Sequence, residues 1–268
     1  MRIDLDLIRL GTSADADEIK DTANAQPLIV SASLLGAHAL GIKNFAYVSG
    51  HSVGELAAAA ISGAISDEDA LRLVRARGIE MAKAAALSPA GMSAVLGGDR
   101  DTVLKKLVEL NLVAANDNGG GQIVAAGDLS ALASLSENPP EGARIRALAV
   151  AGAFHTSFMT PAVEPLRALA ATMSTSPTTI SVISNKDGEV VTDGAQVLTR
   201  IVNQIANPVR WDLCMEAMKK LGITGVIELP PAGTLVGLLK RGAPEIETFA
   251  LKSADDLSAA KEFAGRHA

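Results

Sequence analysis

The sequence is poor in residues that form disulfides or bind metals. Of its 268 residues, one is cysteine (Cys214) and four are histidine. A single cysteine excludes an internal disulfide and is typical of a reducing compartment, so we expect a cytoplasmic protein. Because the histidines are far apart in sequence, no set of metal ligands is apparent, and we expect no metal site.

Positive charge and long apolar runs are also scarce. The 24 lysines and arginines are outnumbered by 30 acidic residues, which gives a net charge of −6. Proteins that bind nucleic acid through its phosphates need a positive surface, so general nucleic-acid binding is disfavoured. No apolar run approaches the roughly 18 residues of a membrane-spanning helix, and the acidic N-terminal region does not resemble a signal peptide. We therefore expect a globular protein that binds neither nucleic acid nor a membrane.

The most informative motif is Gly-His-Ser-Val-Gly at residues 50–54. An apolar run at 45–48 precedes it and an alanine-rich segment beginning at Glu55 follows, which predicts a strand, a tight turn and a helix. In such an elbow the two glycines remove Cβ atoms that would clash in the turn. The serine hydroxyl then lies beside the helix N-terminus, where backbone N–H groups can stabilise an oxyanion. Ser52 is therefore the predicted nucleophile.

A serine hydroxyl needs a base, and histidine is the usual one. His51 is adjacent to the serine, so its side chain should point away from the hydroxyl; His267 is the penultimate residue, and His38 lies within a predicted helix. His155 lies between a predicted strand and a predicted helix, in the kind of loop that carries catalytic groups. His155 is therefore the predicted base. No acid is apparent as a third member, and a mid-chain histidine disfavours an esterase or lipase of the α/β-hydrolase class.

A cation lies on the apolar face of a predicted helix. Ser66 begins a capping-box pattern, and the helix after it should run to about Ala86. One face of this helix carries Ala70, Val74, Arg77 and Met81. Two interpretations of Arg77 stay open: its guanidinium reaches the surface from the edge of the stripe, or it is buried and needs a carboxylate partner.

The order of predicted elements divides the chain. Residues 90–151 read as strand, helix, two strands, helix and strand, which is the ferredoxin-like order. The predicted hairpin between the middle strands is Asn-Asp-Asn-Gly-Gly-Gly at 116–121. On both sides the pattern has α/β character. We expect a large subdomain from residues 1–89 and 152–268, with a small subdomain inserted at 90–151.

Several of these motifs, in this order, are similar to the malonyl-CoA:acyl-carrier-protein transacylase family. The resemblance covers essentially the whole chain. The matching segments are Gly-His-Ser-Val-Gly-Glu at 50–55, Ala-Arg-Gly at 76–78, Asn-Asp-Asn at 116–118 followed by 121–127, Gly-Ala-Phe-His at 152–155 and Asn-Gln-Ile-Ala-Asn-Pro-Val at 203–209.

The resemblance implies an α/β-hydrolase-like large subdomain with a parallel sheet and a ferredoxin-like insert. It also implies transfer of malonyl from malonyl-CoA to the phosphopantetheine thiol of acyl carrier protein, through an ester on Ser52. His155 would be the base and Arg77 would bind the malonate carboxylate. No cofactor beyond these substrates is implied, and a monomer is expected.

Other residues receive roles by the same resemblance. The Val53 N–H would contribute to the oxyanion hole, and the Gln204 carbonyl would orient the histidine. Phe154 resembles the bulky residue of malonyl-selective members, which crowds an α-methyl branch. The hairpin residues Asn116 and Asn118 are assigned to substrate binding.

The sequence departs from the family at two places. The first strand and the Gly-Gln-Gly motif of the family, whose glutamine helps to form the oxyanion hole, have no counterpart here, and Pro230 and Ala232 replace two glycines. A weakly active, truncated homologue, or a catalytically silent one that only binds acyl carrier protein, is therefore one alternative. A serine esterase and an acyltransferase domain from a polyketide or multifunctional fatty-acid synthase are the others.

Overall fold

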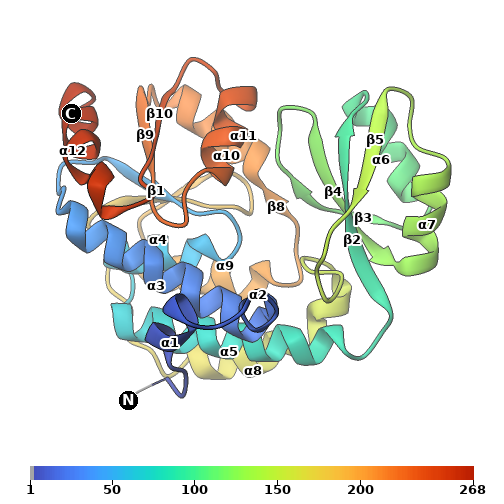
Figure 1. The fold of residues 1–268 in the computed structure, drawn as a ribbon, viewed down its shortest axis with the longest axis horizontal. Coiled ribbons are helices and arrows are strands. Elements are labelled where there is room, and N and C mark those ends of the chain that lie inside the picture. Colours follow the sequence, from blue (N-terminus) through green and yellow to red (C-terminus); the bar gives the residue numbers. More distant parts are fainter. Residues whose placement is uncertain (1–2) are drawn as a thin grey trace.

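A computed structural model describes residues 3–268, which form a mixed α/β structure (Figure 1). The N-terminal third is mostly helical and contains one strand before the elbow. Its elements are α1 (Leu7–Thr12), α2 (Ala16–Lys20), α3 (Thr22–Leu40), β1 (Tyr47–Ser49), α4 (Gly54–Ile61) and α5 (Asp67–Ala85).

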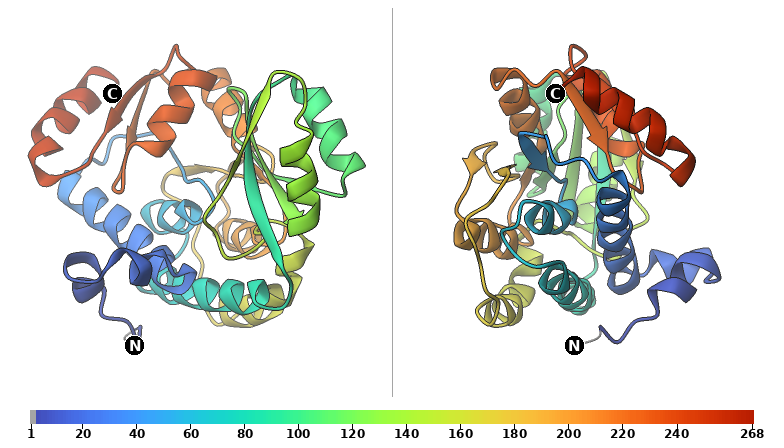
Figure 2. Two further views of the ribbon diagram at one scale, coloured as in Figure 1. Left: turned by 45° about the vertical axis from the view of Figure 1, so that its right-hand side comes forward. Right: turned by 90° about the vertical axis from the view of Figure 1, so that its left-hand side faces the viewer.

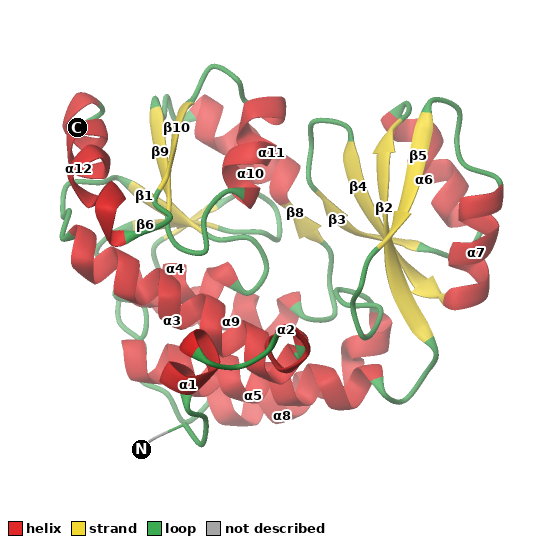
Figure 3. Cartoon of the chain, in the orientation of Figure 1, coloured by secondary structure: helices red, strands yellow, loops and turns green. Residues whose placement is uncertain are grey.

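The middle third forms most of an antiparallel sheet, seen on the right of Figure 3. Its elements are β2 (Ala90–Gly97), α6 (Arg100–Glu109), β3 (Val113–Asp117), β4 (Gln122–Asp128), α7 (Leu129–Glu137) and β5 (Ala143–Ala147). The strand order is β5-β2-β4-β3-β8, and the fifth strand, β8 (Val209–Arg210), pairs in parallel with β3. This strand lies outside the predicted range 90–151.

The two faces of this sheet pack against different neighbours. Apolar side chains of α6 and α7 cover one face, where Leu107 and Leu135 pack with Val95. The other face places Met92 and Val124 near the loop after β5. That loop contains Phe154, so the sheet is packed directly against a predicted site segment.

The last third returns to short strands and amphipathic helices. Its elements are η1 (Ser157–Met159), α8 (Thr160–Ala170), β6 (Ser181–Ile183), β7 (Val190–Val191), α9 (Gly194–Gln204), α10 (Trp211–Lys220), β9 (Gly225–Glu228), α11 (Thr234–Gly242), β10 (Glu247–Ala250), η2 (Ala254–Asp256) and α12 (Leu257–Arg266).

Outside the five-stranded sheet the strands form two small sheets. In the first, β1 pairs in parallel with β6, and β6 pairs antiparallel with β7. In the second, β9 pairs in parallel with β10. Helices α3, α4, α5, α8 and α9 pack together below them and supply the largest apolar core, as the turned views in Figure 2 show. Its fully buried side chains include Leu56, Leu73 and Ile205.

Helix α3 begins several residues before its proline, Pro27. Pro27 favours the first turn of a helix, yet the helix begins at Thr22 and is capped by the Asp21 carboxylate, which accepts from the Ala23 N–H. A proline inside a helix leaves the carbonyl four residues earlier without its usual donor. Here that carbonyl belongs to Ala23, and the Arg75 guanidinium donates to it at 2.7 Å. A tertiary contact therefore supplies the hydrogen bond that the proline cannot make.

The described residues contain neither a membrane-spanning helix nor a cluster of metal ligands. Among residues 3–268, no helix combines the length and apolar character needed to cross a lipid bilayer. Over the same residues, no group of three or more histidine, cysteine, aspartate or glutamate side chains is placed to hold a metal ion.

Candidate active site

The turn between β1 and α4 has the geometry of a nucleophile elbow. Ser52 has a φ of +51°, in the left-handed region that side chains other than glycine rarely adopt. A Cβ on Gly50 would lie 2.1 Å from the carbonyl carbon of Gly54, so glycine is required there. At Gly54 an added Cβ would meet nothing within 4 Å, so the expectation that both glycines relieve a clash is wrong for the second.

One amide side chain, that of Asn185, forms hydrogen bonds to the backbone of the elbow. Asn185, which follows β6 and is fully buried, accepts from the Ser52 N–H through Oδ1 at 2.8 Å. Its Nδ2 donates to the Gly50 carbonyl at 2.7 Å. A strained backbone persists where its surroundings over-determine it, and these two hydrogen bonds hold the backbone on both sides of His51.

His155 lies where a base for Ser52 must lie. Its Nε2 is 2.7 Å from the Ser52 Oγ, and its Nδ1 is 3.0 Å from the Gln204 carbonyl oxygen. Because a carbonyl can only accept, Nδ1 carries the proton and the Nε2 lone pair faces the hydroxyl. Burial, and next the nearby Arg77 cation, lower the pKa of His155 to about 3. The imidazole is therefore neutral at neutral pH and can accept a proton.

Arg77 is buried beside the same hydroxyl. Its side chain is 2% exposed, so the interpretation in which it reaches the surface is wrong. Nη2 donates to the Ser52 Oγ at 3.2 Å and to the Gln204 Oε1 at 2.9 Å, while Nη1 donates to Gln26 Oε1 at 2.5 Å. Desolvation lowers its pKa to about 10, so the group remains a cation. Among the described residues, its Nε has no hydrogen-bond partner.

The hairpin between β3 and β4 reaches the elbow. The His51 Nε2–H donates to Asn118 Oδ1 at 2.7 Å, and the ring packs edgewise on Trp211 with centroids 5.6 Å apart. His51 thus points away from the serine hydroxyl, as its position next to Ser52 in the turn predicts. Asn116 is also buried, and its strand pairs with β8.

Two further predicted residues lie beside the reacting groups in the chain. Phe154 is half-buried between the helical core and the sheet face around Met92. Among the described residues, no hydrogen bond is donated by the Val53 N–H, which belongs to the residue after the nucleophile. An N–H in this position is available to a ligand oxygen.

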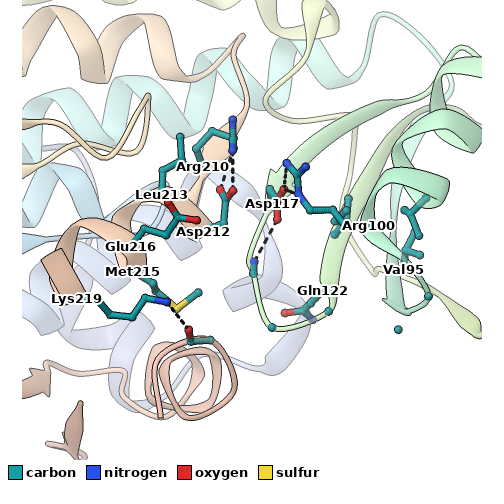
Figure 4. A pocket seen from close by; sticks show the side chains of 18 residues that line it. Val95, Arg100, Asp117, Gln122, Arg210, Asp212, Leu213, Met215, Glu216 and Lys219 are labelled. Carbon is teal, nitrogen blue, oxygen red and sulfur yellow. Dashed lines mark hydrogen bonds and ion pairs between the residues drawn. The ribbon is translucent and has the colours of Figure 1, made fainter. Parts of the chain in front are cut away.

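A pocket of about 410 Å³ lies apart from this cluster, between the hairpin and α10 (Figure 4). Two ion pairs lie in its lining: Arg100 contacts Asp117 at 2.8 Å, and Arg210 contacts Asp212 at 2.7 Å. Neither Ser52 nor His155 lines it. The reacting groups therefore lie outside this pocket.

Three polar side chains in the site were missed by sequence reasoning. Gln26, Glu55 and Asn185 are all buried and all bond to predicted site groups. The one signal in the sequence was a charged residue, Glu55, at the start of an alanine-rich helix. Gln26 and Asn185 gave none, because their partners are more than 50 residues away in the chain.

The chain is similar in sequence to known acyl transferases. The family model for the acyl transferase domain matches residues 3–261. The malonyl CoA-acyl carrier protein transacylase of Mycobacterium tuberculosis (strain H37Rv) is 52% identical over 259 residues, which cover 95% of this chain and 86% of that protein.

Solved structures agree with the family match. The crystal structure of MCAT from Mycobacterium tuberculosis superposes with a TM-score of 0.92 at 51% identity, covering 96% of this chain and 87% of that one. A malonyl-transacylase in complex with its type II PKS acyl-carrier protein superposes with a TM-score of 0.90 at 27% identity, covering 96% and 86%.

Proposed function

The chain belongs to the acyl transferase domain family, and we propose that it transfers malonyl from malonyl-CoA to acyl carrier protein. The observation that carries the proposal is the convergence of two side chains, those of His155 and Arg77, on the Ser52 Oγ. The Ser52 Oγ has a neutral imidazole at 2.7 Å and a buried cation, Arg77, at 3.2 Å. The first activates a nucleophile, and the second is suited to an acyl group that ends in a carboxylate.

The first half-reaction forms an ester on the serine. The Ser52 Oγ attacks the thioester carbonyl while its proton moves to the His155 Nε2, and the Val53 N–H donates to the oxyanion. The C–S bond then breaks, and the leaving thiolate of coenzyme A takes the proton from the imidazole. Arg77 binds the free carboxylate of the malonyl group, while the Gln204 Oε1 accepts from the guanidinium nitrogen Nη2 that faces Ser52.

The second half-reaction reverses this order. The phosphopantetheine thiol of acyl carrier protein gives its proton to His155 and attacks the ester carbonyl, and Ser52 leaves with that proton. Asn116 and Asn118, at the hairpin, are assigned to substrate binding. Phe154 crowds an α-methyl branch, so methylmalonyl-CoA should be a poorer substrate. No cofactor takes part in either half.

The finer description of the fold belongs to the same proposal. We assign the four antiparallel strands of 90–151 to a ferredoxin-like small subdomain, and residues 1–89 and 152–268 to an α/β-hydrolase-like large subdomain. The strand order β5-β2-β4-β3 and the two helices on one face support the first assignment. The parallel pair β1 and β6 behind the elbow supports the second. We further propose that the protein is a cytoplasmic monomer.

The test is formation of the acyl-enzyme. Incubation with radiolabelled malonyl-CoA and denaturing electrophoresis should give a labelled band for the parent protein and none for Ser52→Ala. Addition of phosphopantetheinylated acyl carrier protein should move the label to the carrier. Release of free malonate without the carrier would favour a serine esterase, and a folded but unlabelled parent would favour a homologue that has lost catalysis.

A further inference from the structure

Glu55 is a buried acid that the proposed steps do not use. It lies in the first turn of α4, is 3% exposed and forms no ion pair within 4 Å among the described residues. Its Oε1 accepts from the Asn185 backbone N–H at 2.7 Å, and its Oε2 accepts from the Gln204 Nε2 at 2.5 Å. An ionised acid without a direct cation partner is costly to bury, so these two donors must stabilise it.

The two donors lead to the two halves of the site. Asn185 is the side chain that holds the backbone of the elbow at Gly50 and Ser52. Gln204 contacts the other half, since its Oε1 accepts from Arg77 and its backbone carbonyl accepts from His155. Glu55 is thus bonded to both Asn185 and Gln204, the two residues that hold the halves of the site.

The orientation of the Gln204 amide determines whether the Arg77 guanidinium faces an acceptor or a donor. Its Nε2 has two acceptors, the Glu55 Oε2 and the Ser52 carbonyl at 3.0 Å, and its Oε1 is therefore turned toward the guanidinium. A carboxylate can only accept hydrogen bonds. While Glu55 is ionised, the reversed amide would place its oxygen against two other acceptors, the Glu55 Oε2 and the Ser52 carbonyl, and its nitrogen against the guanidinium donor.

We propose that Glu55 is a positioning residue for acyl selectivity: through the Gln204 amide it holds Arg77 in the orientation that receives the carboxylate of the acyl group. This inference rests on the proposed malonyl transfer and adds to it the reason why the cation stays aimed at the serine. Glu55 itself touches neither the substrate nor the serine hydroxyl.

Glutamine at this position mimics the protonated acid and cannot satisfy both donors. If its oxygen accepts from the Asn185 N–H, its amide nitrogen faces the Gln204 Nε2, and reversal of the Gln204 amide relieves this contact between two donors. Arg77 then loses the Gln204 acceptor. Removing a hydrogen bond to a charged group changes an equilibrium by roughly tenfold or more.

The experiment compares kcat/KM for malonyl-CoA and acetyl-CoA in Glu55→Gln and in a matched variant. Glu228→Gln is the control, because Glu228 is also a buried glutamate and accepts from the backbone N–H groups of Gly233, Leu235 and Val236, away from the site. Glu55→Gln should lower the malonyl-to-acetyl ratio by roughly tenfold or more, chiefly through KM for malonyl-CoA. Glu228→Gln should leave the ratio unchanged, even where it lowers the melting temperature.

A double variant tests whether the effect passes through Arg77. In an Arg77→Ala background, Glu55→Gln should change the ratio no further. A parent protein that malonyl-CoA does not label contradicts the proposed function, whereas a labelled parent with the same ratio in both glutamine variants contradicts the positioning role. An equal fall in both substrates for Glu55→Gln also contradicts it.

The parent protein offers a test without substitution, which applies if Glu55→Gln does not fold. Burial raises the pKa of Glu55 to about 7, and its hydrogen bonds to Asn185 and Gln204 and the charges of Arg77 (α5) and Arg200 (α9) oppose that rise. The thiol of Cys214 (α10) stays neutral because burial raises its pKa, and His155 titrates near 3. The malonyl-to-acetyl ratio should therefore fall as the pH is lowered through about 7. A ratio that is constant from pH 8 to about 6 would contradict the role of the ionised acid.

Discussion

In the sheet formed by β2 to β5, strands of five to eight residues pair along their length, whereas the remaining strands contain two to four residues. The difference extends to how each region holds its loops. In the sheet, the register of β2 on β4 runs unbroken from Ala90 to Leu96 and places the hairpin. In the rest, side chains bonded to backbone groups do this, as Asn185 does for the elbow.

A second example of this support is the loop after β9. The Glu228 carboxylate accepts from three backbone N–H groups of the following loop and helix. Most residues of the candidate site come from this short-strand region, and Asn116 and Asn118 come from the sheet. We therefore expect substitutions at the site to change mainly the catalytic rate, and substitutions in the core of the sheet to change mainly the free energy of unfolding. Four predictions test this expectation.

The largest effect is expected for the base. His155→Ala should reduce the rate of acyl-enzyme formation by about 10²–10⁴-fold, because general base catalysis contributes that much. Thermal unfolding of the variant should remain cooperative, since the change removes a side chain at the site and leaves the sheet intact. Rapid-quench measurement of labelled enzyme gives the rate, and His38→Ala, at an exposed position on α3, is the control. A normal rate for His155→Ala would show that another group takes the proton.

The next effect concerns acyl selectivity. Arg77→Ala should weaken malonyl transfer by about 2–5 kcal/mol, the cost of truncating a buried charged hydrogen-bonding partner. Acetyl transfer, which needs no cation, should fall little. The measurement is kcat/KM for both thioesters, with Arg72→Ala on the same helix as the control because that guanidinium pairs with Asp69 at 2.8 Å. Equal losses for both substrates would assign Arg77 a structural role.

The third prediction addresses the sheet. Leu107→Ala should cost about 2–5 kcal/mol of unfolding free energy, because the side chain is 1% exposed and packs on β2. Below the new melting temperature kcat should be unchanged, since no site residue lies in that core. The neighbouring Val108, 74% exposed, supplies Val108→Ala as the control, which should change little. A fall in kcat with no loss of stability would contradict the separation of the two regions.

The smallest effect is expected where the regions meet. Asn118→Ala removes the acceptor of the His51 N–H, and a buried unpaired donor costs about 1–3 kcal/mol. We expect a modest loss of stability and a several-fold loss of malonyl transfer, with Asn138→Ala on the exposed end of α7 as the control. Denaturant unfolding and kcat/KM measure the two quantities. A loss as large as that of Arg77→Ala would mean that the hairpin takes part in catalysis more directly.

The regular elements could be predicted from sequence where local chemistry decides them. Ser66 caps α5 as its capping pattern predicts, since its hydroxyl accepts from the Asp69 N–H at 3.0 Å. The order of strands and helices within residues 90–151 was predicted and agrees with the structure. β7 and β8 were not, because two residues are too few to show an alternating pattern.

The site could be predicted in part. The motif around Ser52 and the position of His155 were found from the residues, and the family resemblance added Gln204. Spacing left two interpretations of Arg77 open, because a helical stripe does not show what covers it. The Glu55–Asn185 and Glu55–Gln204 contacts join residues at least 130 apart in sequence, and no local pattern predicts such pairs.

The parallel pairing of β8 with β3 determines how this protein could be recombined with its relatives. The five-stranded sheet is assembled from two distant stretches of chain, 90–147 and 209–210, so it is not a self-contained cassette. A chimaera that exchanges the first stretch alone would set a foreign β3 against a native β8, whose Val209 is fully buried. The segment from Gln204 to β8 would carry any mismatch straight to the residue that accepts from His155. Grafts should therefore exchange both stretches together.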